Sequence, residues 1–290
     1  MCIRDSSRIS LSNNDSGTGN IIFGKDVASN LDAGSNYNTF IGRNVAAATL
    51  NDATHNIAIG DSAMNDITTA DNNVGIGSSA MLNMTTATQN VAIGRQAMGL
   101  GITTGGSNVA IGYKAGYTNS TAAQNTFVGY RAGQDANASD VTYIGFDSGY
   151  QATGQSNTAC GHRTMDASGC SGANNSAFGR EALGGLTTGG NNTAVGYFAG
   201  HDVTTGSGNT FVGYGAGSIA NGEVNTYVGL NAGANMTTGG YNICLGYAAN
   251  SSSNTSTGQC TLGDANIGNL RCNDTCLLYT SDAADERSSV

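Results

Sequence analysis

The sequence predicts an all-β protein, a β-solenoid or β-roll of about 15 coils of 16–18 residues. Three observations support the solenoid: a five-residue pattern recurs at nearly constant spacing, a glycine ends every copy, and the 290 residues contain no proline. A unit of about 17 residues cannot bury a core alone. Successive units must therefore stack and share one core.

The repeated pattern is Asn-x-x-apolar-Gly, which runs from Asn20–Gly24 to Gln259–Gly263 and has Asn at its first position in 13 of 15 copies. The final glycines are Gly24, Gly42, Gly60, Gly77, Gly94, Gly112, Gly129, Gly145, Gly161, Gly179, Gly196, Gly213, Gly229, Gly246 and Gly263. We expect one coil per copy, with irregular coils at the copies that begin with Val141 and Gln259. With strands about 4.8 Å apart, the 14 intervals predict a rod about 67 Å long.

Each position of the unit has a predicted role. The fourth position is Phe, Ile, Val, Leu or Cys in every copy, which indicates a strand residue that faces the core. A small residue follows three positions after the glycine, and a second short strand should then turn back through Thr-Thr-Gly, as at 187–189. The glycine suits a site that tolerates neither a side chain nor a negative φ. The absence of proline suits coils that donate hydrogen bonds on both sides.

The third position predicts an interface between chains. Strand alternation should turn it away from the core. Its residues nevertheless include neither charges nor amides in fourteen copies: Ile22, Phe40, Ala58, Gly75, Ala92, Ala110, Phe127, Tyr143, Ala159, Ala177, Ala194, Phe211, Tyr227 and Cys244. Apolar residues on both faces of a strand indicate burial on both faces. We therefore expect the outer face to pack on another chain; the alternative is a solvent-exposed surface of small residues.

The two ends of the chain carry related sequences. Met1–Ser6 (MCIRDS) and Cys276–Ser281 (CLLYTS) can be encoded by one DNA element and its reverse complement, which resembles an end sequence used in preparing sequencing libraries. We therefore expect residues 1–6 and 276–290 to be non-native adaptor translation. The expected native organisation is a truncated lead-in or cap at 7–19, solenoid repeats at 20–263, and a junction at 264–275 to a missing C-terminal domain.

Little in the sequence points to metal or redox chemistry. Without Cys2 and Cys276, five cysteines remain (Cys160, Cys170, Cys244, Cys260 and Cys272), an odd number with no paired spacing for a disulfide framework or zinc. We expect Cys160 and Cys260 to be small buried residues. His55, His162 and His201 fall in unlike registers of different coils, so no metal site is expected.

The composition and motifs also argue against several functional classes. A net charge of −9 argues against a nucleic-acid partner, and the short apolar runs argue against membrane insertion. No nucleophile or phosphate-binding motif occurs, and Asp61 and Asp264 share a register but lie many coils apart. We therefore expect neither an enzyme nor a cofactor.

Aromatic residues often follow the repeat glycine. Tyr113, Tyr130, Tyr197, Tyr214 and Tyr247 occupy this position, as does Phe146. An exposed ladder of these tyrosines could contact the sugars of a surface polysaccharide. The alternative is that the rings pack along the rod or across a trimer.

The units resemble the head repeats of trimeric autotransporter adhesins and, more closely, the NTFIGYxAG arrays of bacteriophage tail fibres, as in Asn125–Gly133 (NTFVGYRAG). Residues 261–272 resemble the junction to an endosialidase-type intramolecular chaperone, whose catalytic residues this chain lacks. The resemblance implies a homotrimeric structural shaft of a phage tail fibre in the virion tail. Such a shaft would be a rigid spacer that contacts a host-surface polysaccharide or receptor.

Two alternatives to the tail-fibre shaft remain open. One is the head of a bacterial trimeric surface adhesin, located at the cell surface. The other is an ice-binding solenoid, or one that binds or degrades polysaccharide. Regular ice binding needs Thr in nearly every coil, whereas Ile57, Val74, Val91 and Val109 interrupt Thr at the second position.

Overall fold

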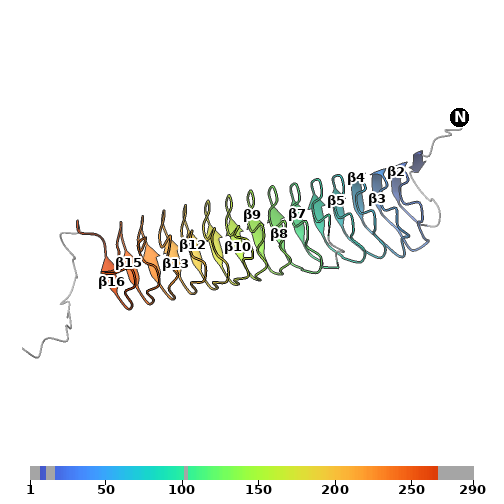
Figure 1. Cartoon of the computed structure of the whole chain (residues 1–290). Helices are drawn as coiled ribbons and strands as arrows, with labels where there is room; N and C mark the ends of the chain where they lie inside the picture. Colours follow the sequence, from blue (N-terminus) through green and yellow to red (C-terminus); the bar gives the residue numbers. More distant parts are fainter. Residues whose placement is uncertain (1–6, 11–16, 101–103, 267–290) are drawn as a thin grey trace, which may run out of the picture.

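The protein is a β-solenoid in a computed structural model that describes residues 7–10, 17–100 and 104–266. Figure 1 shows its coils stacked one after another into a long rod, from the blue N-terminal coils to the red C-terminal ones. The expected adaptor segments 1–6 and 276–290, most of the junction at 264–275, and Cys2, Cys272 and Cys276 lie outside the described residues.

In the described part of the chain, sixteen strands form one sheet in sequence order. They are β1 (Ser7–Ser10), β2 (Ile21–Lys25), β3 (Thr39–Arg43), β4 (Ile57–Asp61), β5 (Val74–Ile76), β6 (Val91–Ile93), β7 (Val109–Ile111), β8 (Thr126–Val128), β9 (Thr142–Ile144), β10 (Thr158–Cys160), β11 (Ser176–Phe178), β12 (Thr193–Val195), β13 (Thr210–Val212), β14 (Thr226–Val228), β15 (Ile243–Leu245) and β16 (Cys260–Leu262). β1 pairs with β2 antiparallel, and β2 to β16 are parallel.

Equivalent repeat positions lie directly beside one another in neighbouring coils. In β12 and β13, for example, Thr193 pairs with Thr210 and Val195 with Val212. The predicted arrangement of one coil per repeat is confirmed. The coils expected to be irregular are regular in their pairing, because β9 pairs in register with both neighbours and β16 with β15. Main-chain hydrogen bonds hold these strands, so losing the first Asn does not disrupt them.

The leading Asn of each repeat forms a buried ladder along the rod. Asn192 Nδ2 donates to Asn175 Oδ1 (3.1 Å) and to the main-chain oxygen of Gly206 (2.9 Å), while Asn192 Oδ1 accepts from the Asn209 main-chain nitrogen (2.9 Å). Only an amide of this length supplies both donors and an acceptor at one site. Val141 interrupts the ladder, and Asn125 Nδ2 there has no partner among the described residues.

The predicted inside and outside of the strand are reversed. The third-position residues are buried, and Phe127, Ala194 and Tyr227 have no exposed surface. The fourth position faces outward, with Val195 40% exposed and Phe23 51% exposed. We call the part of each coil between one strand and the next the return segment. It covers the third-position side chains, so a second chain is not needed to bury them.

The core fills a narrow space between the strand and the return segment in two ways. Phe127 lies between Gly116 and Gly133, where an added Cβ would come within 2.6 and 2.3 Å of the ring. In another coil the third residue is the small Ala92, and the residue four after the glycine is Met98, which is fully buried. In these two coils the large side chain thus comes from opposite positions, whereas Gly116, which follows the small Ala110, makes room for the Phe127 ring of the next coil.

This arrangement predicts strong coupling between Phe127 and Gly133. Phe127→Ala alone should leave a cavity and cost about 3–5 kcal/mol, and Gly133→Met alone should collide with the ring and cost about 1–3 kcal/mol. The double variant recreates the pairing of Ala92 with Met98 and should lose less stability than the sum of the two single changes. Urea unfolding of the four proteins measures this coupling; additive losses would show that the two positions do not share one volume.

The return segment contains no second strand within the described residues, contrary to the prediction. Non-glycine residues there adopt left-handed backbone angles, such as φ 55° at Glu181 and 50° at Leu183, which a strand cannot include. Main-chain bonds still connect the coils, as from Leu183 N to Ala199 O (3.0 Å). The predicted Thr-Thr-Gly turn is present, and Thr187 Oγ1 donates to the main-chain oxygen of Thr204 (3.0 Å).

The prediction for two of the cysteines is also wrong. Cys160 is partly exposed and Cys260 is exposed, because they occupy the outward fourth and second strand positions. Cys170 and Cys244 are the buried ones. Burial raises the pKa of the Cys170 thiol to about 11, so this thiol stays protonated at neutral pH.

Candidate binding edge

Basic residues gather at one edge of the coil. Every Lys and Arg within residues 20–263 lies one or two residues after a repeat glycine: Lys25, Arg43, Arg95, Lys114, Arg131, Arg163 and Arg180. We call these two positions the basic edge. They carry seven basic and four acidic residues, whereas the remainder of 20–263 carries nine acidic residues and no Lys or Arg. Because the coils are in register, the edge is a line of net positive charge along an acidic rod.

Aromatic rings stack along the same edge in two columns. In the first, the centroids of Tyr113 and Tyr130 are 5.2 Å apart, and those of Tyr130 and Phe146 are 5.0 Å apart with planes 8° from parallel. His162 continues this column 5.1 Å from Phe146. The second column is Tyr197 on Tyr214, with centroids 5.1 Å apart and planes 10° from parallel.

Four of the five predicted ladder tyrosines therefore lie in these columns. Tyr247 has no stacked partner among the described residues, because Leu230 and Asp264 occupy the equivalent positions in the coils beside it. It is 62% exposed. The sequence reasoning left out His162, although it stands in the same register as the tyrosines.

The ring faces in the columns are turned toward one another. Cations approach two of the remaining faces, with the Arg95 guanidinium carbon 5.8 Å from the Tyr113 centroid and that of Arg180 5.4 Å from the Tyr197 centroid. These contacts match the alternative of packing along the rod. A sugar at the columns would meet ring edges and hydroxyl groups, and such contact stays a prediction.

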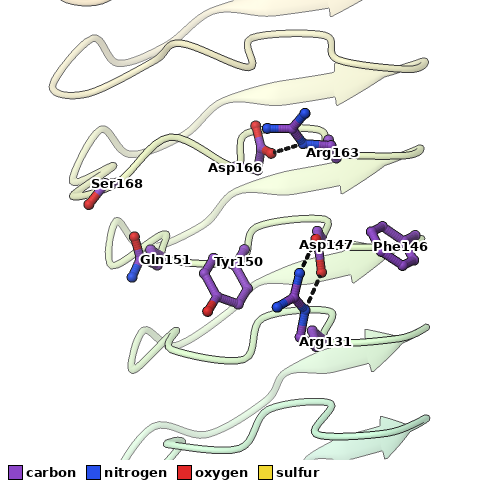
Figure 2. Close-up of a pocket in the computed structure, with 8 residues that line it drawn as sticks. All are labelled: Arg131, Phe146, Asp147, Tyr150, Gln151, Arg163, Asp166 and Ser168. Carbon is purple, nitrogen blue, oxygen red and sulfur yellow. Dashed lines mark hydrogen bonds and ion pairs between the residues drawn. The ribbon is translucent and has the colours of Figure 1, made fainter.

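A groove of about 500 Å³ crosses the edge at the coils of β8, β9 and β10. Figure 2 shows its lining residues, which are Arg131, Phe146, Asp147, Tyr150, Gln151, Arg163, Asp166 and Ser168. Two ion pairs hold its arginines. Arg131 Nε donates to Asp147 Oδ1 (2.7 Å), and Arg163 Nε donates to Asp166 Oδ2 (2.7 Å). The carboxylates raise the pKa of both guanidinium groups, chiefly through these hydrogen bonds.

Arg95 and Lys114 differ from the groove arginines in having no carboxylate within ion-pair distance in the described part of the chain. The Lys114 ammonium lies 4.7 Å from the Tyr117 centroid and 5.7 Å from that of Tyr113. Both cations thus share one aromatic ring, Tyr113. Neighbouring coils therefore present two positive charges that no acid of the described chain neutralises.

The histidines and candidate carboxylates lie apart from one another. The His55 ring lies tilted against that of Tyr37 (centroids 5.1 Å apart), and His201 approaches Asp202 (Nδ1–Oδ1, 2.7 Å). Asp61 pairs with Arg43 (2.7 Å). Within 7–10, 17–100 and 104–266, no three His, Cys, Asp or Glu side chains are grouped to hold a metal ion.

The chain matches no protein-family model and no curated protein. No helix suited to crossing a membrane occurs among the residues that the structure describes. A functional assignment therefore depends on the geometry of the rod, its apolar strand face and its basic edge.

Proposed function

We propose that the chain is the structural shaft of a phage tail fibre, a non-enzymatic homotrimeric spacer in the virion tail that contacts a glycan or receptor of the host surface. The observation that carries the proposal is the uninterrupted parallel sheet from β2 to β16. Bending or stretching such a rod requires hydrogen bonds between coils to break. A rod with this construction suits a spacer that must transmit position and force outside a cell.

The exposed strand face supports assembly with other copies. We define the apolar face by the second and fourth positions of the repeat, which contain no charged residue in any coil. The fourth position is Phe, Ile, Val, Leu or Cys throughout, and the second is Ile, Val or Cys in seven of the 15 copies and Thr or Ser in the other eight. Its exposed members include Ile21, Phe23, Ile57, Ile93, Ile111, Ile144, Phe178, Val195, Val228, Ile243, Leu245 and Leu262. Soluble monomers rarely expose so long a continuous apolar strip. Three rods arranged about a common axis would cover these strips.

Charges placed on the apolar face should therefore dissociate the trimer into single chains. A variant with Val195→Asp, Val212→Asp and Val228→Asp puts three carboxylates at one in-register position of β12, β13 and β14. Light scattering should give three chain masses for the unaltered protein and one for this variant. The matched control places Asp at Thr188, Thr205 and Thr238, which are exposed turn residues, and should stay trimeric. A monomeric unaltered chain, or a variant that remains trimeric, would contradict the proposal.

Cys160 offers an independent check of the same face. It is partly exposed at the fourth position of β10, so copies of it should approach one another at the trimer axis. In a chain with Cys2, Cys260, Cys272 and Cys276 changed to Ser, a short bis-maleimide should link chains in pairs. Cys160→Ser should abolish the linkage, because Cys170 and Cys244 are buried.

A further inference from the structure

We infer that the basic edge between Arg95 and Arg180 binds a linear acidic polysaccharide that lies along the rod over the coils of β6 to β11. This inference rests on the glycan contact proposed above and specifies its chemical class and position. It also moves the contact from the ring faces of the predicted tyrosine ladder to the cations beside them.

Charge is distributed so as to favour an anionic ligand at these coils alone. The basic edge of β6 to β11 carries five cations (Arg95, Lys114, Arg131, Arg163 and Arg180) against Asp147 and Glu181. Three further acids, Asp135, Asp140 and Asp166, lie off the edge on the same coils, so residues 90–191 have no net charge while the rod on either side is negative. In the first three coils, Lys25 and Arg43 are balanced by Asp26 and Asp61, and beyond Arg180 the solenoid has no Lys or Arg. The rest of the surface is acidic, so a polyanion is attracted to this segment and repelled elsewhere.

Arg95 and Lys114 are the strongest candidates to bind carboxylates. They lie on neighbouring coils, and both are free of acidic partners among the described residues. Their contacts with Tyr113 restrict the two side chains without neutralising them. A charge-assisted bond to each therefore replaces water and no existing ion pair.

The groove extends the site toward Arg163. Arg131 uses Nε and Nη2 for Asp147, and Arg163 uses Nε for Asp166. A guanidinium has five donor hydrogens, so both arginines keep N–H groups for a ligand. The hydroxyl of Tyr150 and the amide of Gln151 line the same groove, as Figure 2 shows. Such uncharged polar groups suit the hydroxyls of a sugar.

The arrangement suits a polymer better than a single sugar. The cations recur along a line at intervals of one or two coils, each coil adding about 4.8 Å, and the groove is open rather than enclosed. Each contact is weak because it is exposed to water and salt. Several contacts to one flexible chain add through effective concentration, so affinity should grow with polymer length.

The test measures binding of the full chain to polygalacturonate, neutral dextran and a DNA duplex by calorimetry at two salt concentrations. We expect polygalacturonate to bind, more weakly at high salt, and dextran not to bind. The variant Arg95→Gln/Lys114→Gln should lower the affinity for polygalacturonate about tenfold or more, which corresponds to losing one good charged contact. The matched control, Lys25→Gln/Arg43→Gln, removes the same charge from the same edge and should bind within about twofold of the unaltered chain.

Four results would overturn the inference. These are no binding of polygalacturonate, equal loss in both variants, equal binding of DNA, and a changed molecular mass of Arg95→Gln/Lys114→Gln in light scattering. The last would show that these cations contact another copy of the chain. A fifth result, binding of dextran as tight as that of polygalacturonate, would overturn the acidic class while leaving a glycan contact in place. The shaft proposal can fail independently of this inference, because the variants of the apolar face test it by light scattering without any ligand.

Discussion

Gly196→Ala should open the rod between two coils, at a cost of about 4 kcal/mol or more, which places it among the most damaging single changes. Gly196 has φ 140°, a region that side chains disfavour. A Cβ there would also lie 2.5 Å from the main-chain oxygen of Gly213 in the next coil. The clash is with backbone that itself pairs onward, so relief requires the coils to separate.

Hydrogen exchange resolved by peptide measures this effect, because each coil contacts only its neighbours and opening should be confined to the coils of β12 and β13. Gly169→Ala is the matched control. It also has a positive φ (76°), but no atom lies within 4 Å of the added Cβ, so only the conformational cost of about 1–2 kcal/mol applies. Equal losses in the two variants would show that contact between coils is not the reason for the glycine.

Asn192→Ala should cost about 3–5 kcal/mol, since a buried polar group left without its partner costs about 1–3 kcal/mol. The change removes the donors to Asn175 Oδ1 and Gly206 O and the acceptor for Asn209 N. These groups lie inside the rod, where water cannot replace the lost bonds. Neighbouring Asn residues should lose protection from exchange as well, because each bonds to the next.

Asn235→Ala provides the control for this change. Asn235 is exposed in a turn, and its replacement should alter the free energy of unfolding by less than about 0.5 kcal/mol. Urea unfolding followed by circular dichroism compares the two variants. A loss of less than 1 kcal/mol for Asn192→Ala would mean that the ladder is dispensable for stability. At Val141 the ladder is already interrupted, and the strands there still pair in register.

The reversed strand faces show where sequence reasoning failed. Both the third and the fourth positions are apolar, so alternation by itself does not say which one faces the core. Ile and Val at the fourth position suggested the interior, whereas the structure buries Phe127 and Ala92 at the third. A usable signal was present in the sequence. In several coils the residue four after the glycine is Gly where the third is aromatic, as at Gly133, and Met where the third is small, as at Met98. Gly116, which follows the small Ala110, instead lies against the Phe127 ring of the next coil.

The site was predictable in part. The register of the repeat places Tyr113 and Tyr130 on one line, and it places Arg95 and His162 there too. Whether such residues offer their faces or their edges to solvent depends on torsion angles and on the distance between coils. The pairing of Arg131 with Asp147 likewise depends on side-chain geometry that spacing does not specify. So does the position of Lys114, which has no acid within ion-pair distance among the described residues.

The sequence by itself determined the coil, the number of its copies and the need for glycine at the end of each strand. With a fixed period, residues that are one period apart in the sequence become neighbours in space. The tertiary structure decided which strand face is inside, since that depends on how the return segment covers the strand. It also decided which cations have an acidic partner among the described residues. Both outcomes depend on contacts between side chains a few ångströms apart, and the order of residue types along the chain does not specify those contacts.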